Sequence, residues 1–430
     1  MPPTPRPNVL LVFTDQQRSD TIRALGSSFD ARTPHLDRLV EEGVAFSNCF
    51  CTAPICSPSR ATMMTGLYPS QAGMPGNLYA PSPPLCPTLT TLGHSFQAAG
   101  YETAYHGKWH LGGQIAHHGF EVAEETSHDE GTRHAAATFW DDRDWLRTRR
   151  PLLHVVSFLN PHDHYFYDPN ETDRSYRRPW ANANRDPAGM PPAAAEKRED
   201  WSEARWGAYV RFYEQRIEKA DAELGRLLED FRCAGYLANT WIIFTADHGD
   251  MAGEHDLPFK GPCMYEGVTR VPLVIVLPRT RIAGDVTRRV PDPALSPGRR
   301  NHLCSLIDLL PTMLDLADIE QPDHLPGRSL LPLVRDASAP APHDIVFAEW
   351  HRPPVRMARS RDWKYVRYLG GEEELYHLSE DPHELHNLAD SPDAEDARSR
   401  LATALDRHIA RTRDPFDLLD RHEFIWNPPR

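Results

Sequence analysis

Several stretches of the chain are continuously apolar and rich in β-branched residues. They are residues 9–13 (VLLVF), 152–159 (LLHVVSFL), 240–246 (TWIIFTA) and 271–278 (VPLVIVLP). Apolar runs of this length without polar alternation are typical of strands that are buried on both faces of a parallel or mixed sheet. The first three runs lead directly into polar residues, beginning at Thr14, Asn160 and Asp247.

Helical patterns separate these runs. In residues 33–43 (TPHLDRLVEEG), Leu36, Leu39 and Val40 share one helical face, and Gly43 is the expected C-cap. Residues 208–235 have the spacing of a long amphipathic helix, and residues 302–317 (HLCSLIDLLPTMLDLA) predict a third helix. Alternation of strands and helices predicts an α/β sandwich, in which ligands collect at the carboxyl ends of the strands.

The composition and pattern of the sequence change in two places. Residues 168–198 are rich in Pro, Arg, Asn and Ala, which predicts a long surface excursion such as a lid or an interface arm, and hence favours a homo-oligomer. Residues 336–344 (DASAPAPHD) resemble a linker, followed by short strand patterns at 345–350, 363–369 and 374–378 and a charged helical tail. We therefore predict a catalytic domain at 1–335 and a smaller α+β domain with an antiparallel sheet at 336–430.

Composition narrows the class of protein. The formal net charge of −14, from 47 basic and 61 acidic residues, argues against a nucleic-acid binder that relies on a general positive field. The apolar run at 9–13 is too short for a signal peptide or a membrane span, so we expect a cytoplasmic protein with no membrane association. Seven scattered cysteines, an odd number, argue against a disulfide framework.

Polar residues with chemical potential follow the strands. Asp15-Gln16 and Asp247-His248 together would make a mostly oxygen-donor site for Ca²⁺, Mg²⁺ or Mn²⁺, although either pair alone could be a turn or a helix cap. Lys108 and His110 would lie on one face of an extended segment and suit an anion and a leaving-group oxygen, or else form a solvated strand edge.

Three further residues are candidate site residues only because they lie near these clusters in the sequence pattern. His162 and His164 follow the apolar run at 152–159, and Lys260 lies shortly after the Asp247 loop. Isolated His and Lys side chains are usually solvated surface residues and carry no function of their own.

Residues 51–60 (CTAPICSPSR) pose a separate question. Pro54 and Pro58 predict an irregular segment that is neither helix nor strand, and Cys56 within it could bind zinc, act as a nucleophile or simply pack. The absence of any C-x-x-C pair disfavours zinc. A thiolate nucleophile, whose pKa Arg60 would lower, and a structural cysteine both remain open on spacing alone.

The segment Cys56-Ser57-Pro58-Ser59-Arg60, followed by ATMMTG, resembles the sulfatase signature C-x-P-S-R-x-x-x-x-T-G. Other segments resemble the same family in the same order: residues 7–17, 33–46, 107–112, 245–255, 260–275 and 361–389. The resemblance implies an alkaline-phosphatase-like α/β fold with a large, mostly parallel sheet between helices, and a smaller C-terminal domain. It also implies hydrolysis of a small anionic sulfate ester of a sugar, aryl or alkyl alcohol.

The resemblance also implies roles for individual residues. Cys56 would be oxidised to Cα-formylglycine by a formylglycine-generating enzyme, and its aldehyde hydrate would supply one hydroxyl to attack sulfur and a second to expel sulfate. Asp15, Gln16, Asp247, His248 and residue 56 would hold one divalent cation, usually Ca²⁺. Arg60 and Lys108 would stabilise the hydrate, Lys108 and Lys260 would bind the sulfate oxygens, His110 would assist collapse of the hydrate, and His162 would lie near the leaving-group oxygen.

Two positions depart from the common pattern. Many arylsulfatases resemble one another in having D-D after the first strand and D-N after the later one, whereas this chain has Asp15-Gln16 and Asp247-His248. This variant is similar to choline sulfatases and phosphonate monoester hydrolases. It leaves Mn²⁺ or Mg²⁺ open as the metal, and it leaves phosphonate monoesters and phosphodiesters open as substrates. A catalytically silent binding protein with unmodified Cys56 is the third hypothesis.

Overall fold

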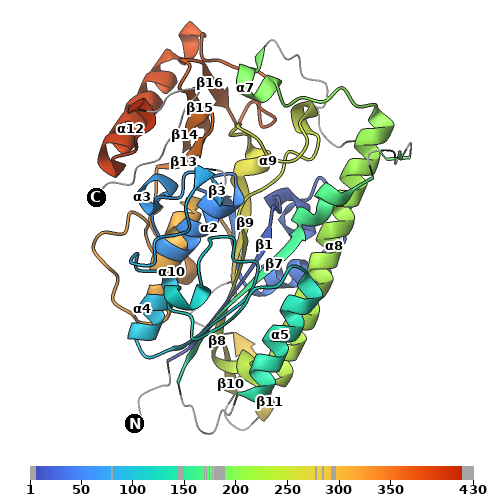
Figure 1. The fold of residues 1–430 in the computed structure, drawn as a ribbon, viewed down its shortest axis with the longest axis vertical. Helices are drawn as coiled ribbons and strands as arrows, with labels where there is room; N and C mark the ends of the chain where they lie inside the picture. Colours follow the sequence, from blue (N-terminus) through green and yellow to red (C-terminus); the bar gives the residue numbers. More distant parts are fainter. Residues whose placement is uncertain are drawn as a thin grey trace.

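The fold is a sheet sandwiched between two layers of helices, with a smaller sheet packed at one end (Figure 1). It comes from a computed structural model of the chain, which describes residues 6–78, 81–143, 150–168, 170, 172–173, 175–176, 178, 189–276, 278–282, 285–291 and 297–418. This architecture confirms the predicted α/β sandwich with an additional antiparallel sheet.

The large sheet has eight strands, and most of them run in the same direction. Strand β9 is antiparallel to both of its neighbours, whereas the other neighbouring strands pair in parallel. The strand order is β12 (Gly298–Ser305), β2 (Val44–Phe50), β9 (Arg270–Val276), β8 (Thr240–Ala246), β1 (Asn8–Asp15), β7 (Leu152–Pro161), β5 (Glu102–Gly107) and β6 (Val122–Glu124).

The central strand β1 explains why its sequence is apolar without alternation. Val9, Leu11 and Phe13 face one hydrophobic cluster, and Leu10 and Val12 face the other. Successive side chains of a strand point to opposite faces, so a strand covered on both faces buries every residue. The same reasoning applies to β7 and β8, and it confirms the four strands predicted from the apolar runs.

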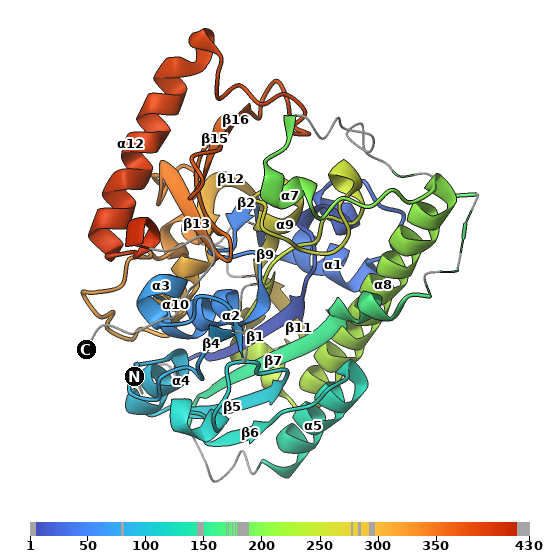
Figure 2. The same cartoon turned by 45° about the horizontal axis from the view of Figure 1, so that its top comes forward.

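Helices cover both faces of the sheet, as Figure 2 shows from a second direction. One layer contains α1 (Pro34–Glu42), α5 (Asp129–Asp142) and the long α8 (Glu203–Cys233). The other contains α2 (Cys56–Thr65), α4 (Leu92–Ala98), α10 (Leu309–Leu316) and α11 (Leu331–Arg335). The described residues also form three short helices, α3 (Pro69–Ala72), α7 (Pro192–Ala195) and α9 (Glu266–Thr269). They form two further pairs of strands, β3 (Asn77–Leu78) with β4 (Pro81–Ser82) and β10 (Arg279–Ile282) with β11 (Asp285–Pro291).

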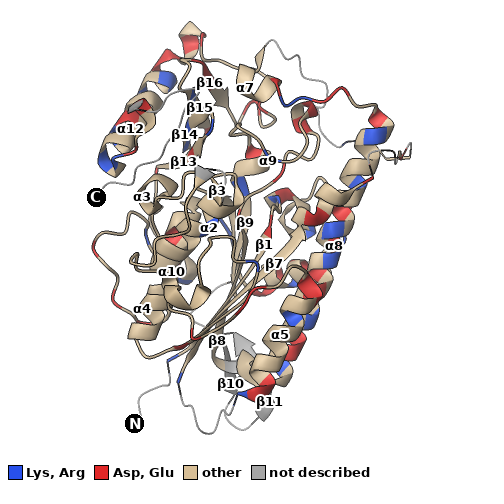
Figure 3. Cartoon of the chain, in the orientation of Figure 1, with Lys and Arg blue, Asp and Glu red and all other residues tan. Residues whose placement is uncertain are grey.

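The long helix α8 is amphipathic. Its buried residues, including Leu224, Leu227 and Phe231, pack against the sheet, and its outer face carries charges of both signs (Figure 3). Some of these charges pair one turn apart, as Arg232 does with Glu229. None of the described helices has the length and apolar character that a membrane span requires.

The C-terminal sheet is antiparallel and packs against a single long helix. Its order is β13 (Ile345–His351), β14 (Pro354–Ser360), β15 (Trp363–Tyr368) and β16 (Glu373–His377), and α12 (Glu395–Thr412) covers one face. Glu349 on β13 connects this sheet to α3, because its carboxylate accepts hydrogen bonds from the backbone and hydroxyl of Ser70.

Two expectations from the sequence were wrong in detail. Residues 56–65 form a helix rather than an irregular segment, because Pro58 occupies its first turn, where a backbone N–H has no intrahelical partner. Residues 302–305 belong to β12 and not to a helix. Gly43 is the C-cap of α1, as the sequence predicted; its φ is an extended −118°, and a Cβ there would lie 2.8 Å from the carbonyl oxygen of Ile275.

The predicted excursion at 168–198 lies partly outside the described residues. Within it, Pro192–Ala195 forms the single turn α7. Its expected role as a lid or an interface arm stays a prediction.

His408 on α12 makes the stability of the protein sensitive to acid. Its ring stacks on Phe347 at 4.0 Å, and neither ring nitrogen has a hydrogen-bond partner among the described residues. Burial, with smaller contributions from Arg411 and Arg356, lowers the pKa of His408 to about 3. The unfolded chain binds the proton near pH 6.5 but the folded protein does not, so stability is lost as the pH falls from there toward the folded pKa.

Replacing His408 by Phe should remove this loss while keeping the aromatic stack. We expect the unfolding free energy of His408→Phe, relative to the wild type, to gain about 2 kcal/mol between pH 7 and pH 5. Urea denaturation at a series of pH values measures this difference. A difference that does not change with pH would contradict the assignment.

Candidate active site

Polar side chains from four elements meet at one edge of the large sheet. Asp15 ends β1, Asp247 directly follows β8, Lys108 directly follows β5, and Cys56 begins α2. Since β1, β8 and β5 run in the same direction, their carboxyl ends lie at the same edge. The structure thereby brings together the clusters that the sequence placed at strand ends.

Four side chains at this edge form a group that fits a divalent cation, which we call the cation cluster. One ligand atom from each of Asp15, Cys56, Asp247 and His248 lies within 4.8 Å of the others, and all four residues are buried. Gln16 lies beside this group, with its backbone N–H 3.0 Å from Oδ1 of Asp247. Two carboxylates, an amide and an imidazole are a donor set suited to Ca²⁺, Mg²⁺ or Mn²⁺.

Arg60 holds the two carboxylates from the side of α2. Its Nη2 lies 2.8 Å from Oδ2 of Asp15, and its Nε lies 2.8 Å from Oδ2 of Asp247. Nη1 donates to the backbone oxygen of Lys108 at 2.6 Å and to the Ser157 hydroxyl at 2.9 Å. Arg60 is only 1% exposed, so its guanidinium is a structural counter-charge for both carboxylates.

The electrostatics around Cys56 favour an anion at that position. Its Sγ lies 2.9 Å from Nζ of Lys260, 3.9 Å from Nζ of Lys108 and 3.4 Å from Nε2 of His248. Burial alone would raise the pKa of the Cys56 thiol, but these three groups outweigh burial and hold it well below its usual range. The two lysines, more than Arg60, therefore provide the activation that the sequence had assigned to Arg60.

The pKa values of Asp15 and Asp247 are shifted in opposite directions. Burial and the Cys56 thiolate would raise the pKa of Asp15, but Lys108, His162 and Arg60 together lower it far below its usual value. Burial, and next the negative charge of Asp15, raise the pKa of Asp247. Two adjacent buried carboxylates thus need more positive charge than Arg60 supplies, which is what a bound cation would provide.

Lys108 and His110 reach the site by a route that the sequence did not predict. The backbone is not extended there: Gly107 has φ +103° and His110 has φ +56°. A Cβ at position 107 would lie 2.0 Å from the carbonyl oxygen of Ser157, so this turn requires glycine. Lys108 nonetheless reaches Asp15 at 2.6 Å, and His110 lies close enough to Cys56 to help lower the pKa of its thiol.

The predicted histidines after β7 have different environments. His162 is half-buried in the short helix His162–Phe166, close enough to Asp15 to help lower its pKa. His164 is fully buried, and its Nδ1 lies 3.0 Å from the backbone oxygen of Pro161. His162 therefore lies at the site, whereas His164 supports it from behind.

No role was predicted for Asp250, which lies beside Gln16 and His164, behind the cation cluster. Asp250 Oδ2 accepts a hydrogen bond of 2.6 Å from Nε2 of Gln16 and lies 3.2 Å from Nε2 of His164. The available signal was its position, three residues after Asp247 in the segment TADHGD.

Cys51, the other cysteine of the segment 51–60, is a packing residue. It lies in the hydrophobic cluster beneath α2, and burial raises the pKa of its thiol well above the usual value. All seven cysteines are free, as their scattered distribution predicted.

Comparison with known proteins shows which families this chain matches. The sequence pattern of the family described as Sulfatase matches residues 7–319, and that described as N-sulphoglucosamine sulphohydrolase, C-terminal, matches residues 253–411. The chain is 32% identical to the uncharacterized sulfatase YidJ of Escherichia coli strain K12, over 96% of this chain and 88% of that protein.

The chain belongs to the sulfatase family. As a member of this family it is an enzyme, and the resemblance noted in the sequence is confirmed. It is also 29% identical to a choline-sulfatase of Rhizobium meliloti, over 90% of this chain and 83% of that protein.

Solved structures show the same fold. The 2-O GAG sulfatase BT1596 has a TM-score of 0.84 and 25% identity, with 96% of this chain and 94% of that chain covered. The phosphonate monoester hydrolase of Agrobacterium radiobacter has a TM-score of 0.75 and 23% identity, with 96% and 97% covered. The second likeness concerns the fold alone.

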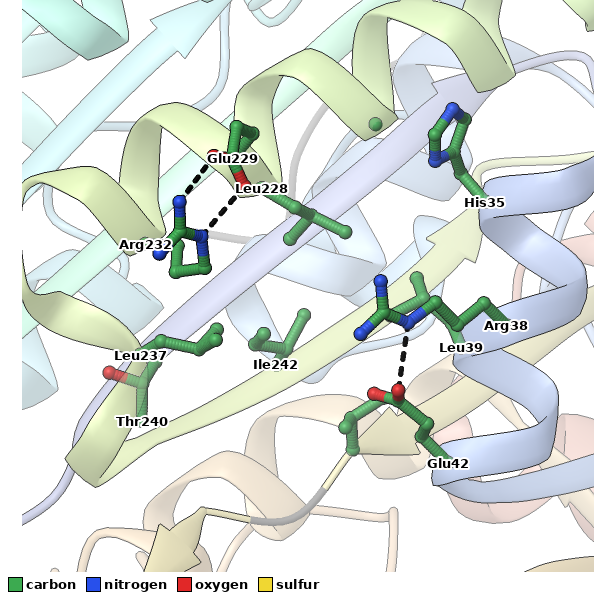
Figure 4. A pocket seen from close by; sticks show the side chains of 12 residues that line it. His35, Arg38, Leu39, Glu42, Leu228, Glu229, Arg232, Leu237, Thr240 and Ile242 are labelled. Atoms are coloured by element: carbon green, nitrogen blue, oxygen red, sulfur yellow. Dashed lines mark hydrogen bonds and ion pairs between the residues drawn. The ribbon is translucent and has the colours of Figure 1, made fainter. Parts of the chain in front are cut away.

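A separate cavity of about 330 Å³ lies at the opposite end of β8, between α1 and α8 (Figure 4). Its floor includes Leu39 and Ile242, and the charged groups at its rim pair with each other, as Arg38 does with Glu42. The residues that line it include none of the predicted catalytic or metal-binding residues.

Removal of the Arg60 guanidinium should strongly destabilise the metal-free protein. We expect Arg60→Leu to lower the unfolding free energy by about 3–5 kcal/mol, because two buried carboxylates lose their shared counter-charge. Urea denaturation with a chelator present measures the loss. Arg38→Leu is the matched control: its side chain is 67% exposed, and loss of its ion pair with Glu42 should cost about 0–1 kcal/mol. Equal losses in the two variants would contradict the assigned role.

Proposed function

We propose that this sulfatase hydrolyses a sulfate monoester by means of a formylglycine at position 56 and one divalent cation. The observation that carries this proposal is the position of Cys56. Cys56 is the first residue of α2. Its side chain lies close to Lys260, His248 and His110, within the cluster that contains Asp15 and Asp247. A nucleophile generated there would face both the metal ligands and two cationic groups.

The cation would be held by Asp15, Gln16, Asp247, His248 and the modified residue 56. We propose Ca²⁺, which suits the buried carboxylate and amide oxygens, with Mn²⁺ or Mg²⁺ as alternatives because His248 contributes a nitrogen. When bound, the cation supplies Lewis-acid stabilisation of negative charge at the nucleophile and the transferring group.

The cationic side chains would bind the sulfate group. Lys260 donates to Oε1 of Gln16 and to Cys56, and Lys108 donates to Asp15, so both ammonium groups already face the reacting position. Burial lowers the pKa of Lys260, but the charge of Cys56 and other neighbours outweighs burial and raises it overall, so the side chain stays charged. Fixed positive charge around developing negative charge is where electrostatic catalysis is strongest.

The histidines would move protons. His110 lies close to residue 56 and would remove a proton there when the hydrate collapses and releases sulfate. His162, half-buried at the rim of the site, would protonate the leaving-group oxygen. Arg60 would keep the carboxylates in place and stabilise the hydrate together with Lys108.

A second activity is favoured by the Gln16 and His248 positions. These residues replace the carboxylate and amide that are common in arylsulfatases, and so they give a less negative ligand set. We propose phosphonate monoester or phosphodiester hydrolysis at this same site as the alternative function. The tetrahedral anionic group would meet the same lysines in each case.

Oxidation of Cys56 tests the mechanism directly. Peptide mass spectrometry across residues 50–60, on protein made in a host that contains the modifying enzyme, should show formylglycine at position 56. Cys56→Ala should then lower turnover by several orders of magnitude, because the nucleophile is lost. Cys51→Ala, which changes a neighbouring buried cysteine, should keep measurable turnover. Unmodified thiol with full activity would argue against this mechanism.

Substrate preference separates the two candidate activities. We expect kcat/KM for an aryl sulfate to exceed that for the matching aryl phosphonate monoester and aryl phosphodiester, each measured with the same preparation and the same metal. A higher kcat/KM for the phosphonate or the diester would replace the first function by the second.

A further inference from the structure

Gln16 has a side chain with two unlike ends, and only one of them suits a cation. The amide oxygen can ligate a metal ion, whereas the amide NH₂ presents hydrogens and is repelled by it. Which end faces the metal depends on the groups that surround the amide. A glutamine therefore needs an orienting partner that a carboxylate at the same position would not need.

Two charged neighbours determine the orientation of the Gln16 amide. Nε2 lies 2.6 Å from Oδ2 of Asp250, and Oε1 lies 2.7 Å from Nζ of Lys260. A carboxylate can only accept hydrogen bonds and an ammonium can only donate them, so both contacts require the same orientation. Lys260 also contacts Cys56 and His248, two members of the cation cluster, so Oε1 faces the cluster and Nε2 faces away.

The surroundings of Asp250 keep it an acceptor. Asp250 is 0% exposed, and its Oδ1 accepts from the backbone N–H of Ala252 at 2.6 Å and from the Tyr209 hydroxyl at 3.4 Å. Its Oδ2 lies 3.2 Å from Nε2 of His164. A buried carboxylate with several donors around it is the form that can hold an amide NH₂ in a single orientation.

The backbone of Gln16 is also fixed on both sides. Its N–H donates to Asp247, and its carbonyl oxygen accepts from the Tyr213 hydroxyl at 2.7 Å. Its φ of +70° is uncommon for a residue other than glycine and is maintained by these contacts. Because the backbone of Gln16 is held, only its side-chain torsions can still rotate. Asp250 restrains the last of these torsions, which turns the terminal amide.

We propose that Asp250 is a positioning residue that fixes the Gln16 amide with its oxygen toward the cation and thereby tightens metal binding. This inference rests on the proposed role of Gln16 as a metal ligand. The partners of metal ligands orient those ligands, and their loss commonly weakens metal affinity by about 10–100-fold. Asn at position 250 could present either end of its own amide, so only the Lys260 contact would still favour one orientation of Gln16.

The experiment measures binding of Mn²⁺ and Ca²⁺ to the full chain after removal of metal with a chelator. The signal of free Mn²⁺ in electron paramagnetic resonance and calorimetry with Ca²⁺ give the dissociation constants. We expect Asp250→Asn to raise Kd by about 10–100-fold. Asp308→Asn is the matched control, because Asp308 is equally buried but bonds Ser305, Arg328 and His343. Its Kd should equal that of the wild type.

A double-variant cycle separates positioning from a general structural effect. If Asp250 acts through Gln16, then Asp250→Asn should cause no further loss of affinity in a protein that already carries Gln16→Ala. Losses that multiply would overturn the inference, as would an unchanged Kd for Asp250→Asn or an equal loss in Asp308→Asn. Absence of metal binding by the wild type would overturn the proposed metal site and this inference with it.

A crystal structure of the wild type with Mn²⁺ provides a test that needs no variant. The structure should show Oε1 of Gln16 bound to Mn²⁺ while Nε2 stays on Asp250. Release of the amide from Asp250, or a Gln16 side chain directed away from the metal, would overturn the inference.

Discussion

The buried contact of Arg60 with two carboxylates is the interaction on which the site depends. Strands β1 and β8 are parallel neighbours, so Asp15 and Asp247 at their ends are brought side by side without solvent. Such a pair is strongly unfavourable unless a counter-charge lies between the two groups. Arg60 provides this counter-charge, because one guanidinium nitrogen contacts Asp15 and another contacts Asp247. Its third nitrogen donates to the backbone oxygen of Lys108.

The helical conformation of α2 explains the spacing of the sulfatase signature. Cys56 and Arg60 are four residues apart, which in a helix places them on the same face, one turn from each other. The arginine can then bind the carboxylates while residue 56 faces the cluster. Pro58 is compatible with this arrangement because it lies in the first turn, and Gly66 ends the helix with φ +66°.

Local pattern explains both what could be predicted and what could not. The apolar runs of β1, β7 and β8 predicted a buried sheet, and the rule for parallel strands then predicted that Asp15 and Asp247 would meet. Direction is not encoded in an apolar run, so the sequence allowed a mixed sheet but did not predict that β9 would be the antiparallel strand. The prolines around Cys56 suggested irregular structure because local pattern does not reveal which turn of a helix they occupy. Asp250 escaped notice because its role depends on contacts with Gln16 and His164, which lie far from it in the sequence.

The burial of Cys56 sets an order of events for the modification that we propose. Cys56 is 0% exposed, every residue of α2 is buried, and the Cys56 side chain is surrounded by Lys260, His248 and Asp15. An enzyme that acts on the thiol could not reach it in the folded protein without opening the sheet edge, where Arg60 joins α2 to β1 and β8. Oxidation therefore has to precede folding of this region. The same contacts that position the nucleophile would exclude the modifying enzyme once they form, so a chain that folds first would keep its cysteine.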